Sequence, residues 1–199
     1  MQFKVARLWL FSLSIVLIGI GYILWPVSVK TKQLTDFNLT QHQGGAFTLA
    51  HLKGKWSFIF FGYTHCPDIC PVTLTLLRQV KQKLTAHPEY VDDTQYIFVS
   101  VDGQRDTPEK LAKYVNYFDP QLIGASGTEQ QVNALTRQLG IVYIRQPEAT
   151  AGQYFIDHSA TIVLINPQGE IAEQFTAPHA VATIVDRYVK IRQPVKESS

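Results

Sequence analysis

A long apolar run opens the chain, and shorter apolar runs alternate with helix-like patterns after it. Residues 8–29 contain no Asp, Glu, Lys or Arg. At about 1.5 Å per residue, a helix of this length crosses the roughly 30 Å hydrocarbon layer of a bilayer. The run ends in Tyr-Ile-Leu-Trp-Pro, not in the small residues that mark a signal-peptide cleavage site. We therefore expect residues 1–30 to form an uncleaved membrane anchor with a short cytoplasmic N-terminus.

From residue 31 the pattern becomes that of an α/β domain. Nearly continuous apolar runs predict buried strands, and apolar residues spaced three or four apart predict helices. The strands are expected at 36–39, 46–49, 56–62, 95–101, 141–146, 161–165 and 171–175, and the helices at 71–84, 107–118, 128–139 and 179–191. This order predicts a mixed central sheet flanked by helices over residues 31–195. Residues 196–199 are expected to be a flexible tail.

Composition and charge indicate a globular domain and argue against a nucleic-acid-binding protein. The chain has 199 residues, of which 46% are apolar and 17% are charged, as in a globular domain with a hydrophobic core. The net charge is +2, and the lysines and arginines are scattered along the chain. A nucleic-acid-binding surface is therefore not expected, because such a surface gathers its basic residues.

Chemistry is concentrated at Cys66 and Cys70, which are the only two cysteines in the sequence. They directly follow the apolar run at 56–62 and precede a helix, where free backbone amides and the helix dipole stabilise a thiolate. Pro71 disfavours a helix that begins much earlier than Cys70. We therefore expect Cys66 on the loop and Cys70 in the first helical turn, with both sulfurs in one shallow, exposed pocket.

Three interpretations of the cysteine pair are open. A stabilising disulfide is disfavoured, because the loop that it closes is very small and a domain of this size needs no such crosslink. A redox-active dithiol usually has two intervening residues, whereas this pair has three. A soft metal ion would need a further ligand. Among the six histidines, His158 is the best candidate, since it lies in a segment expected to form the loop before a hairpin strand.

The chain resembles the Sco/SenC family of copper proteins in three separated segments. These are Gly62–Pro71, Ser100–Glu109, and Asp157–Ser159 together with Asn166–Gly169. The resemblance implies a thioredoxin-like fold and a copper metallochaperone that delivers copper to the binuclear copper centre of cytochrome c oxidase, with thiol-disulfide oxidoreductase activity left open. It also implies a copper site made of Cys66, Cys70 and His158. The expected location is the bacterial inner membrane, with a single span and the folded domain on the periplasmic side.

The donor types agree with this resemblance. Two thiolates and one imidazole suit Cu(I), and the nitrogen ligand also allows Cu(II). Zinc remains a competing metal, although it usually takes a fourth ligand. Because an oxidising compartment favours the disulfide, copper loading requires a thiol reductant as a partner.

Three aspartates near the motifs could support the metal ligands, and two other functions compete with the copper metallochaperone. Asp102, Asp106 and Asp157 are candidates for contacts just outside the metal ligands, with capping or surface ion pairs as the alternative. A thiol-disulfide reductase that keeps the acceptor's copper-ligand cysteines reduced is the main alternative function. The segment around His158 weakens it, because it lacks the proline that faces the dithiol in thioredoxins. A membrane-tethered redox or copper sensor is the third possibility.

Overall fold

The structure is a computed structural model that describes residues 32–148, 150 and 153–193. The expected anchor at residues 1–30, with its apolar run at 8–29, lies outside the described residues, as does the expected tail at 196–199. Within the described ranges, no helix is both long enough and apolar enough to cross a bilayer.

The domain is built on a seven-stranded mixed sheet, which confirms the predicted thioredoxin-like α/β class. The strands are β1 (Asn38–Gln41), β2 (Ala46–Thr48), β3 (Trp56–Gly62), β4 (Thr94–Ser100), β5 (Ile123–Ser126), β8 (Ile162–Ile165) and β9 (Ile171–Phe175). Their order across the sheet is β2-β1-β5-β4-β3-β8-β9. Strands β3, β4 and β5 are parallel, whereas β8 runs antiparallel to β3. The central strand β3 is almost fully buried, as its continuous apolar run predicts.

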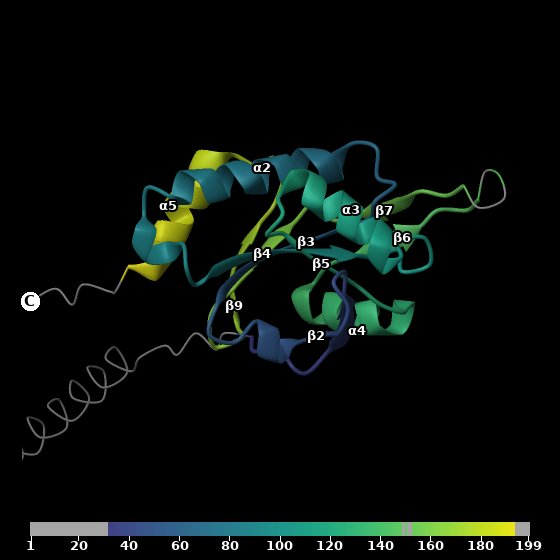
Figure 1. Cartoon of the computed structure of the whole chain (residues 1–199), viewed down its shortest axis with the longest axis horizontal. Coiled ribbons are helices and arrows are strands. Elements are labelled where there is room, and N and C mark those ends of the chain that lie inside the picture. Colours follow the sequence, from purple (N-terminus) through teal and green to yellow (C-terminus); the bar gives the residue numbers. More distant parts are fainter. Residues whose placement is uncertain (1–31, 149, 151–152, 194–199) are drawn as a thin grey trace, which may run out of the picture. The chain divides into compact units, whose positions relative to one another are not determined.

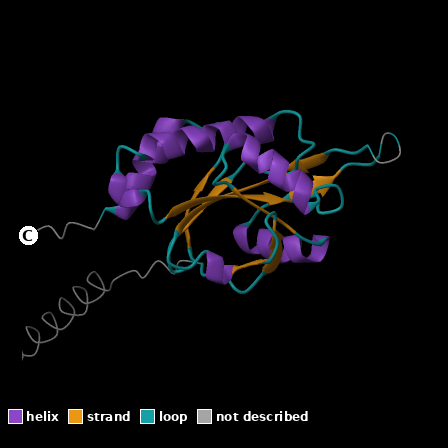
Figure 2. Ribbon diagram, viewed as in Figure 1, coloured by secondary structure: helices purple, strands orange, loops and turns teal. Residues whose placement is uncertain are grey.

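Four α-helices cover the sheet. They are α2 (Ile69–Leu84), α3 (Pro108–Phe118), α4 (Glu129–Leu139) and α5 (Val181–Arg192). Figure 1 shows α2, α3 and α5 over one face of the sheet and α4 on the other. The same layers are visible in Figure 2, where the orange strands lie between the purple helices. Short 3₁₀ helices occur at Leu49–His51 and Pro88–Tyr90.

Several predicted boundaries are confirmed by local chemistry. The side chain of Thr107 accepts a hydrogen bond from the backbone N–H of Lys110, and Pro108 is the first residue of α3. Gly140 has a left-handed backbone with φ of 67° and ends α4. Helix α2 begins at Ile69, so Cys66 is on the loop and Cys70 is in the first turn, as expected.

A separate two-stranded sheet corrects one prediction. Strand β6 (Tyr143–Arg145) pairs antiparallel with β7 (Ile156–His158), and Tyr143 lies opposite His158. The prediction that His158 lies in a loop is therefore wrong, because it is the last residue of β7. The expected strand at 141–146 is correspondingly shorter than predicted.

Gly62–Pro71, Ser100–Glu109 and Asp157–Ser159 meet at one end of the main sheet, whereas the turn Asn166–Gly169 lies at the other end, where the N–H of Gly54 donates to the carbonyl of Pro167 at 2.9 Å. Gly62 and Ser100 are directly opposite in the parallel β3–β4 pair, and the N–H of Val101 donates to the carbonyl of Gly62 at 2.8 Å. The loops after β3 and β4 therefore leave the sheet side by side. Because β8 is antiparallel to β3, with Ile162 opposite Phe60, the segment before β8 arrives at the same end.

Arg192 joins α5 to the opposite end of β4. Its guanidinium donates two hydrogen bonds to Asp93, at 2.6 and 2.8 Å, and one to the Tyr188 hydroxyl at 2.8 Å. It also lies 4.3 Å from the centroid of the Tyr90 ring. The Arg192 side chain is only 11% exposed, whereas the Asp93 carboxylate that it binds is 39% exposed, so the guanidinium is the shielded partner of this pair.

Replacing Arg192 should therefore destabilise the domain without changing the structure at the opposite end of the sheet. We expect Arg192→Ala to lower the free energy of unfolding by about 2 kcal/mol, because a charged hydrogen-bond network and cation–π contacts are lost. Urea unfolding of the protein measures this change. Arg187→Ala is the matched control, since the 56% exposed Arg187 pairs with Glu173 at the surface. Its expected cost is below about 0.5 kcal/mol, and equal losses in the two variants would contradict the prediction.

Candidate metal centre

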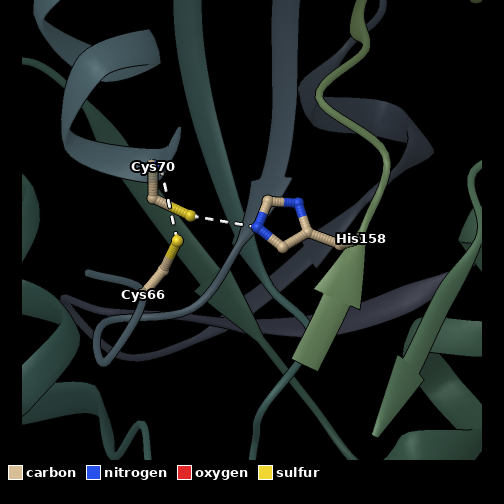
Figure 3. Close-up of side chains that lie close together, drawn as sticks. All are labelled: Cys66, Cys70 and His158. Atoms are coloured by element: carbon tan, nitrogen blue, oxygen red, sulfur yellow. Dashed lines mark hydrogen bonds between the residues drawn. The ribbon is translucent and has the colours of Figure 1, made fainter. Parts of the chain in front are cut away.

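The structure brings Cys66, Cys70 and His158 together. Figure 3 shows the two sulfurs and the imidazole ring converging from the loop before α2, the first turn of α2 and the end of β7. Their ligand atoms all lie within 4.8 Å of one another. The Cys70 sulfur is 3.3 Å from Nε2 of His158. Two sulfurs and one imidazole nitrogen at this spacing match the donor set of a soft, low-coordinate metal ion.

Burial of the sulfurs differs from the expected shallow, exposed pocket. The sequence expectation was that both would be open to solvent, but Cys70 is 0% exposed and Cys66 only 8%. His158 is half-buried. The cause is the position of Cys70, which lies on the side of α2 that faces the sheet and packs against Gly62 at the end of β3. Solvent therefore reaches the centre past Cys66 and His158.

The two thiols have opposite acidities. A hydrogen bond from the Cys70 side chain, with further ones from the backbone of Asp68 and Cys70, lowers the pKa of Cys66 to about 4. The hydrogen bond with Cys66, together with burial, raises the pKa of Cys70. At neutral pH Cys66 is therefore a thiolate, while Cys70 keeps its proton. A metal ion that binds both sulfurs displaces that one proton.

The backbone fixes the tautomer of His158. Its Nδ1 lies 3.1 Å from the carbonyl oxygen of Ser159, and a carbonyl only accepts, so Nδ1 carries the hydrogen. The lone pair of Nε2 is then free and faces the Cys70 sulfur. The rings of Phe60 and Tyr63 approach the imidazole edge-on, with centroids at 5.9 and 6.0 Å. The ring is thus held in the orientation that a metal ligand needs.

The three aspartates of the sequence analysis lie outside this group of ligand atoms. Asp157 is exposed, and its carboxylate accepts a hydrogen bond from the side chain of Gln146. The partner of the His158 ring is the Ser159 carbonyl instead. Asp102 and Asp106 are both buried in the loop that follows β4. Each of them is hydrogen-bonded to residues of a ligand-bearing segment.

Gly62 is a functional position that the sequence analysis did not identify. A Cβ atom on residue 62 would lie 2.4 Å from the Cys70 sulfur and 2.9 Å from Cε2 of Phe98. Both distances are shorter than non-bonded atoms allow, so only glycine leaves room for the sulfur. The sequence signal was a glycine at the end of a buried strand, four residues before Cys66. That signal alone does not reveal which atom fills the space.

The sequence also matches proteins of a known family. The model of the SCO1/SenC family matches residues 27–193. The SCO2 homolog of Bos taurus, a mitochondrial protein, is 36% identical over 151 residues, which are 76% of this chain and 56% of that protein. The chain thus spans little more than half the length of this curated relative.

Solved structures agree with the sequence match. The crystal structure of Arabidopsis thaliana ScoI with copper bound has a TM-score of 0.73 and 32% identity, and the match covers 79% of this chain and 96% of that one. The crystal structure of yeast Sco1 with copper bound has a TM-score of 0.74 and 30% identity, with coverages of 83% and 92%.

The close approach at Gly62 leads to a direct test. Gly62→Ala should displace the Cys70 sulfur and weaken its hydrogen bond to Cys66, so the pKa of Cys66 should rise toward the usual thiol value. The pH dependence of Cys66 alkylation in the reduced, metal-free domain measures this change. Gly124→Ala is the matched control, because its Cβ would meet the side chains of Leu111 and Val115 instead of the dithiol. An unchanged alkylation profile in Gly62→Ala would contradict the steric argument.

The wild-type protein should show the asymmetry of its two thiols. The native pKa of Cys66 lies below that of an unfolded thiol, so its thiolate persists as the pH falls from 9 until it approaches about 4. We therefore expect a nearly constant rate of Cys66 alkylation by iodoacetamide from alkaline to mildly acidic pH, with a loss near that pKa. The same depressed pKa contributes folding stability that is fully present above the unfolded pKa and is lost as the pH falls toward 4. A single rate midpoint near pH 8.5, as in a free thiol, would refute this.

Proposed function

This chain belongs to the SCO1/SenC family, and we propose that it is a copper metallochaperone whose ligands are Cys66, Cys70 and His158. One observation carries the proposal. Three donors that are separated by up to 92 positions in sequence lie within 4.8 Å of one another. Relatives of known structure, 32% and 30% identical to this chain, are described as having copper bound.

The chemistry of the three donors suits transfer as well as binding. Copper is the cargo here, and it enters as the Cys70 proton leaves, so that two thiolates and Nε2 of His158 can bind it. Three ligands satisfy Cu(I), and the imidazole also supports Cu(II). A three-coordinate ion leaves room for an incoming thiolate, so copper can pass on by ligand exchange without ever being released into water.

The resemblance to the family supports a proposal for the acceptor and for the location. We propose that the acceptor is the copper-binding subunit of cytochrome c oxidase, which is the target implied by the Sco/SenC resemblance. The apolar run at residues 8–29 would anchor the chain in the inner membrane as a single span. Residues 31–195 would then face the periplasm.

Loading requires both cysteines to be reduced. In an oxidising compartment the pair tends to form a disulfide, which cannot bind copper in this way. A partner dithiol would attack that disulfide and form a mixed disulfide, and its second thiol would then release Cys66 and Cys70. Two electrons and one proton pass to this chain at neutral pH, since Cys66 stays a thiolate; the other proton goes to water, and the partner leaves as its own disulfide. The oxidised form is therefore the copper-free form.

The acidity of Cys66 supports a second candidate function. A thiolate beside a protonated thiol is also what a thiol-disulfide reductase needs, because the thiolate attacks and the second thiol resolves the mixed disulfide. In that role His158 would have no ligand function. The two functions therefore differ in their dependence on His158.

Substitution of the histidine separates the two functions. In an anaerobic titration, the reduced wild-type domain should bind one copper per chain, and Cys66→Ser or Cys70→Ser should abolish binding. His158→Ala should weaken Cu(II) binding by about 100-fold, since loss of an outer contact alone typically costs about 10- to 100-fold. The reactivity of the dithiol should survive in this variant.

His87→Ala is the control for this experiment, because His87 lies in a turn beside Glu89 and Tyr90, away from the centre. It should bind copper as the wild type does. Stoichiometry well below one, or binding that survives alkylation of the cysteines, would refute the copper proposal. Oxidase assembly that survives without His158 but fails without either cysteine would instead establish the reductase.

A further inference from the structure

The loop between β4 and α3 carries two buried carboxylates one turn apart. Asp102 and Asp106 are 3% and 2% exposed, and the backbone N–H of Asp106 donates to the carbonyl of Asp102 at 2.9 Å. Because this turn is closed, the two side chains have fixed positions relative to each other. They bond to different parts of the molecule.

Asp106 binds the segment that carries Cys66. One carboxylate oxygen accepts a hydrogen bond from the backbone N–H of Thr64 at 2.9 Å and from the hydroxyl of Ser100 at 2.6 Å. The other accepts from the hydroxyl of Thr64 at 2.6 Å. Three charge-assisted hydrogen bonds thus tie the loop two residues before Cys66 to the end of β4.

Asp102 binds the segment that leads to His158. Its carboxylate accepts hydrogen bonds from Nε of Arg105 and, at 2.6 Å, from the hydroxyl of Tyr154. Arg105 donates in turn to the carbonyl of Tyr154 at 2.9 Å, and its guanidinium lies 3.5 Å from the centroid of that ring. Tyr154 is held at its ring, its hydroxyl and its backbone. It lies two residues before β7, the strand that ends in His158.

We propose that residues 101–106, here named the positioning loop, set the two halves of the metal centre mainly through different carboxylates: Asp106 positions Cys66, and Asp102, through Arg105 and Tyr154, positions His158. The inference rests on the proposed function. Neither carboxylate belongs to the group of ligand atoms formed by Cys66, Cys70 and His158, so both aspartates are positioning residues.

The physical basis is that each carboxylate is buried and satisfied. Removing one leaves buried donors without partners, and the segment they belong to must move to find water. Removing Asp106 frees Thr64 and hence the Cys66 loop, whereas removing Asp102 frees Arg105 and Tyr154 and hence the start of β7. The two losses therefore have different chemical consequences, because Cu(I) depends on the thiolates and Cu(II) also depends on the imidazole.

The experiment compares Asp106→Ala and Asp102→Ala in the reduced domain, with and without copper. Asp106→Asn and Asp102→Asn are the conservative variants, since an amide keeps the shape and one of the two acceptor oxygens but not the charge. Asp93→Asn is the matched control: Asp93 also holds two segments together, through Arg192, but at the other end of β4. If either alanine variant fails to fold, Thr64→Val and Tyr154→Phe take its place, since each removes one hydroxyl from the same contacts.

We expect Asp106→Ala to weaken Cu(I) binding by about 10-fold or more and to shift the dithiol midpoint potential of the copper-free domain. Asp102→Ala should leave that potential unchanged, weaken Cu(II) binding by about 10-fold and alter the Cu(II) electron paramagnetic resonance spectrum. In the copper-free domain, the NMR signals of the His158 ring should move in Asp102→Ala and stay in place in Asp106→Ala. Both asparagine variants should recover most of the wild-type behaviour.

Three results would overturn the inference. The first is that both alanine variants change the same readouts. The second is that Asp93→Asn changes them as well, which would make the effect one of general stability. The third is that the asparagine variants behave like the alanine variants, which would assign the effect to charge and not to position. The potential and the His158 signals need no copper, so they decide the inference even if the wild-type domain fails to bind copper and the proposed function falls.

Discussion

The parallel pairing of β3 with β4 is the constraint on which the metal centre depends. It runs without interruption from Trp56 opposite Thr94 to Gly62 opposite Ser100, so both strands end at the same level. The cysteine loop and the loop with the two buried aspartates must therefore emerge side by side. The antiparallel strand β8 then brings the His158 segment to the same end. The donors meet because of sheet geometry, and none of them lies in the paired strands β3 and β4.

The buried negative charges at this end of the sheet are stable only because each one accepts hydrogen bonds. A thiolate on Cys66 and carboxylates on Asp102 and Asp106 would be costly to bury alone. Each is stabilised by nearby donors: backbone and side-chain groups at the sulfur, hydroxyls and one N–H at Asp106, and a guanidinium and a phenol at Asp102. The centre is therefore preorganised, and the binding of a metal needs little rearrangement.

Much of this arrangement could be predicted from sequence, and the rest depends on contacts that sequence does not display. The continuous apolar run predicts β3 to the residue, and Pro108 and Gly140 mark helix ends by local rules. Strand β5 escaped prediction because its four residues include Gly124 and Ala125, which give no strand pattern. The cysteines could be singled out because they are the only two in the sequence. His158 was chosen among six histidines by its expected place in the fold and by the Sco/SenC resemblance.

Details of the surroundings of the metal centre could not be predicted in the same way. The direction of a side chain on a three-residue strand depends on register, and the register of β7 is set by its pairing with β6. Asp157 and His158 are adjacent and therefore point to opposite faces, so Asp157 bonds to Gln146 instead of the imidazole. The pocket was expected to be exposed because the sequence does not show how deeply α2 covers Cys70.

Gly62 bears on how this centre could be moved to another protein. The sulfur of Cys70 occupies space that a side chain on residue 62 would need, so an empty position in the host strand is as necessary as the three ligands. A graft of Cys-x3-Cys and His onto a related scaffold would reproduce the donors and still misplace one sulfur if the strand ended in any larger residue. The minimal transferable unit is therefore four residues, and one of them contributes only by having no side chain.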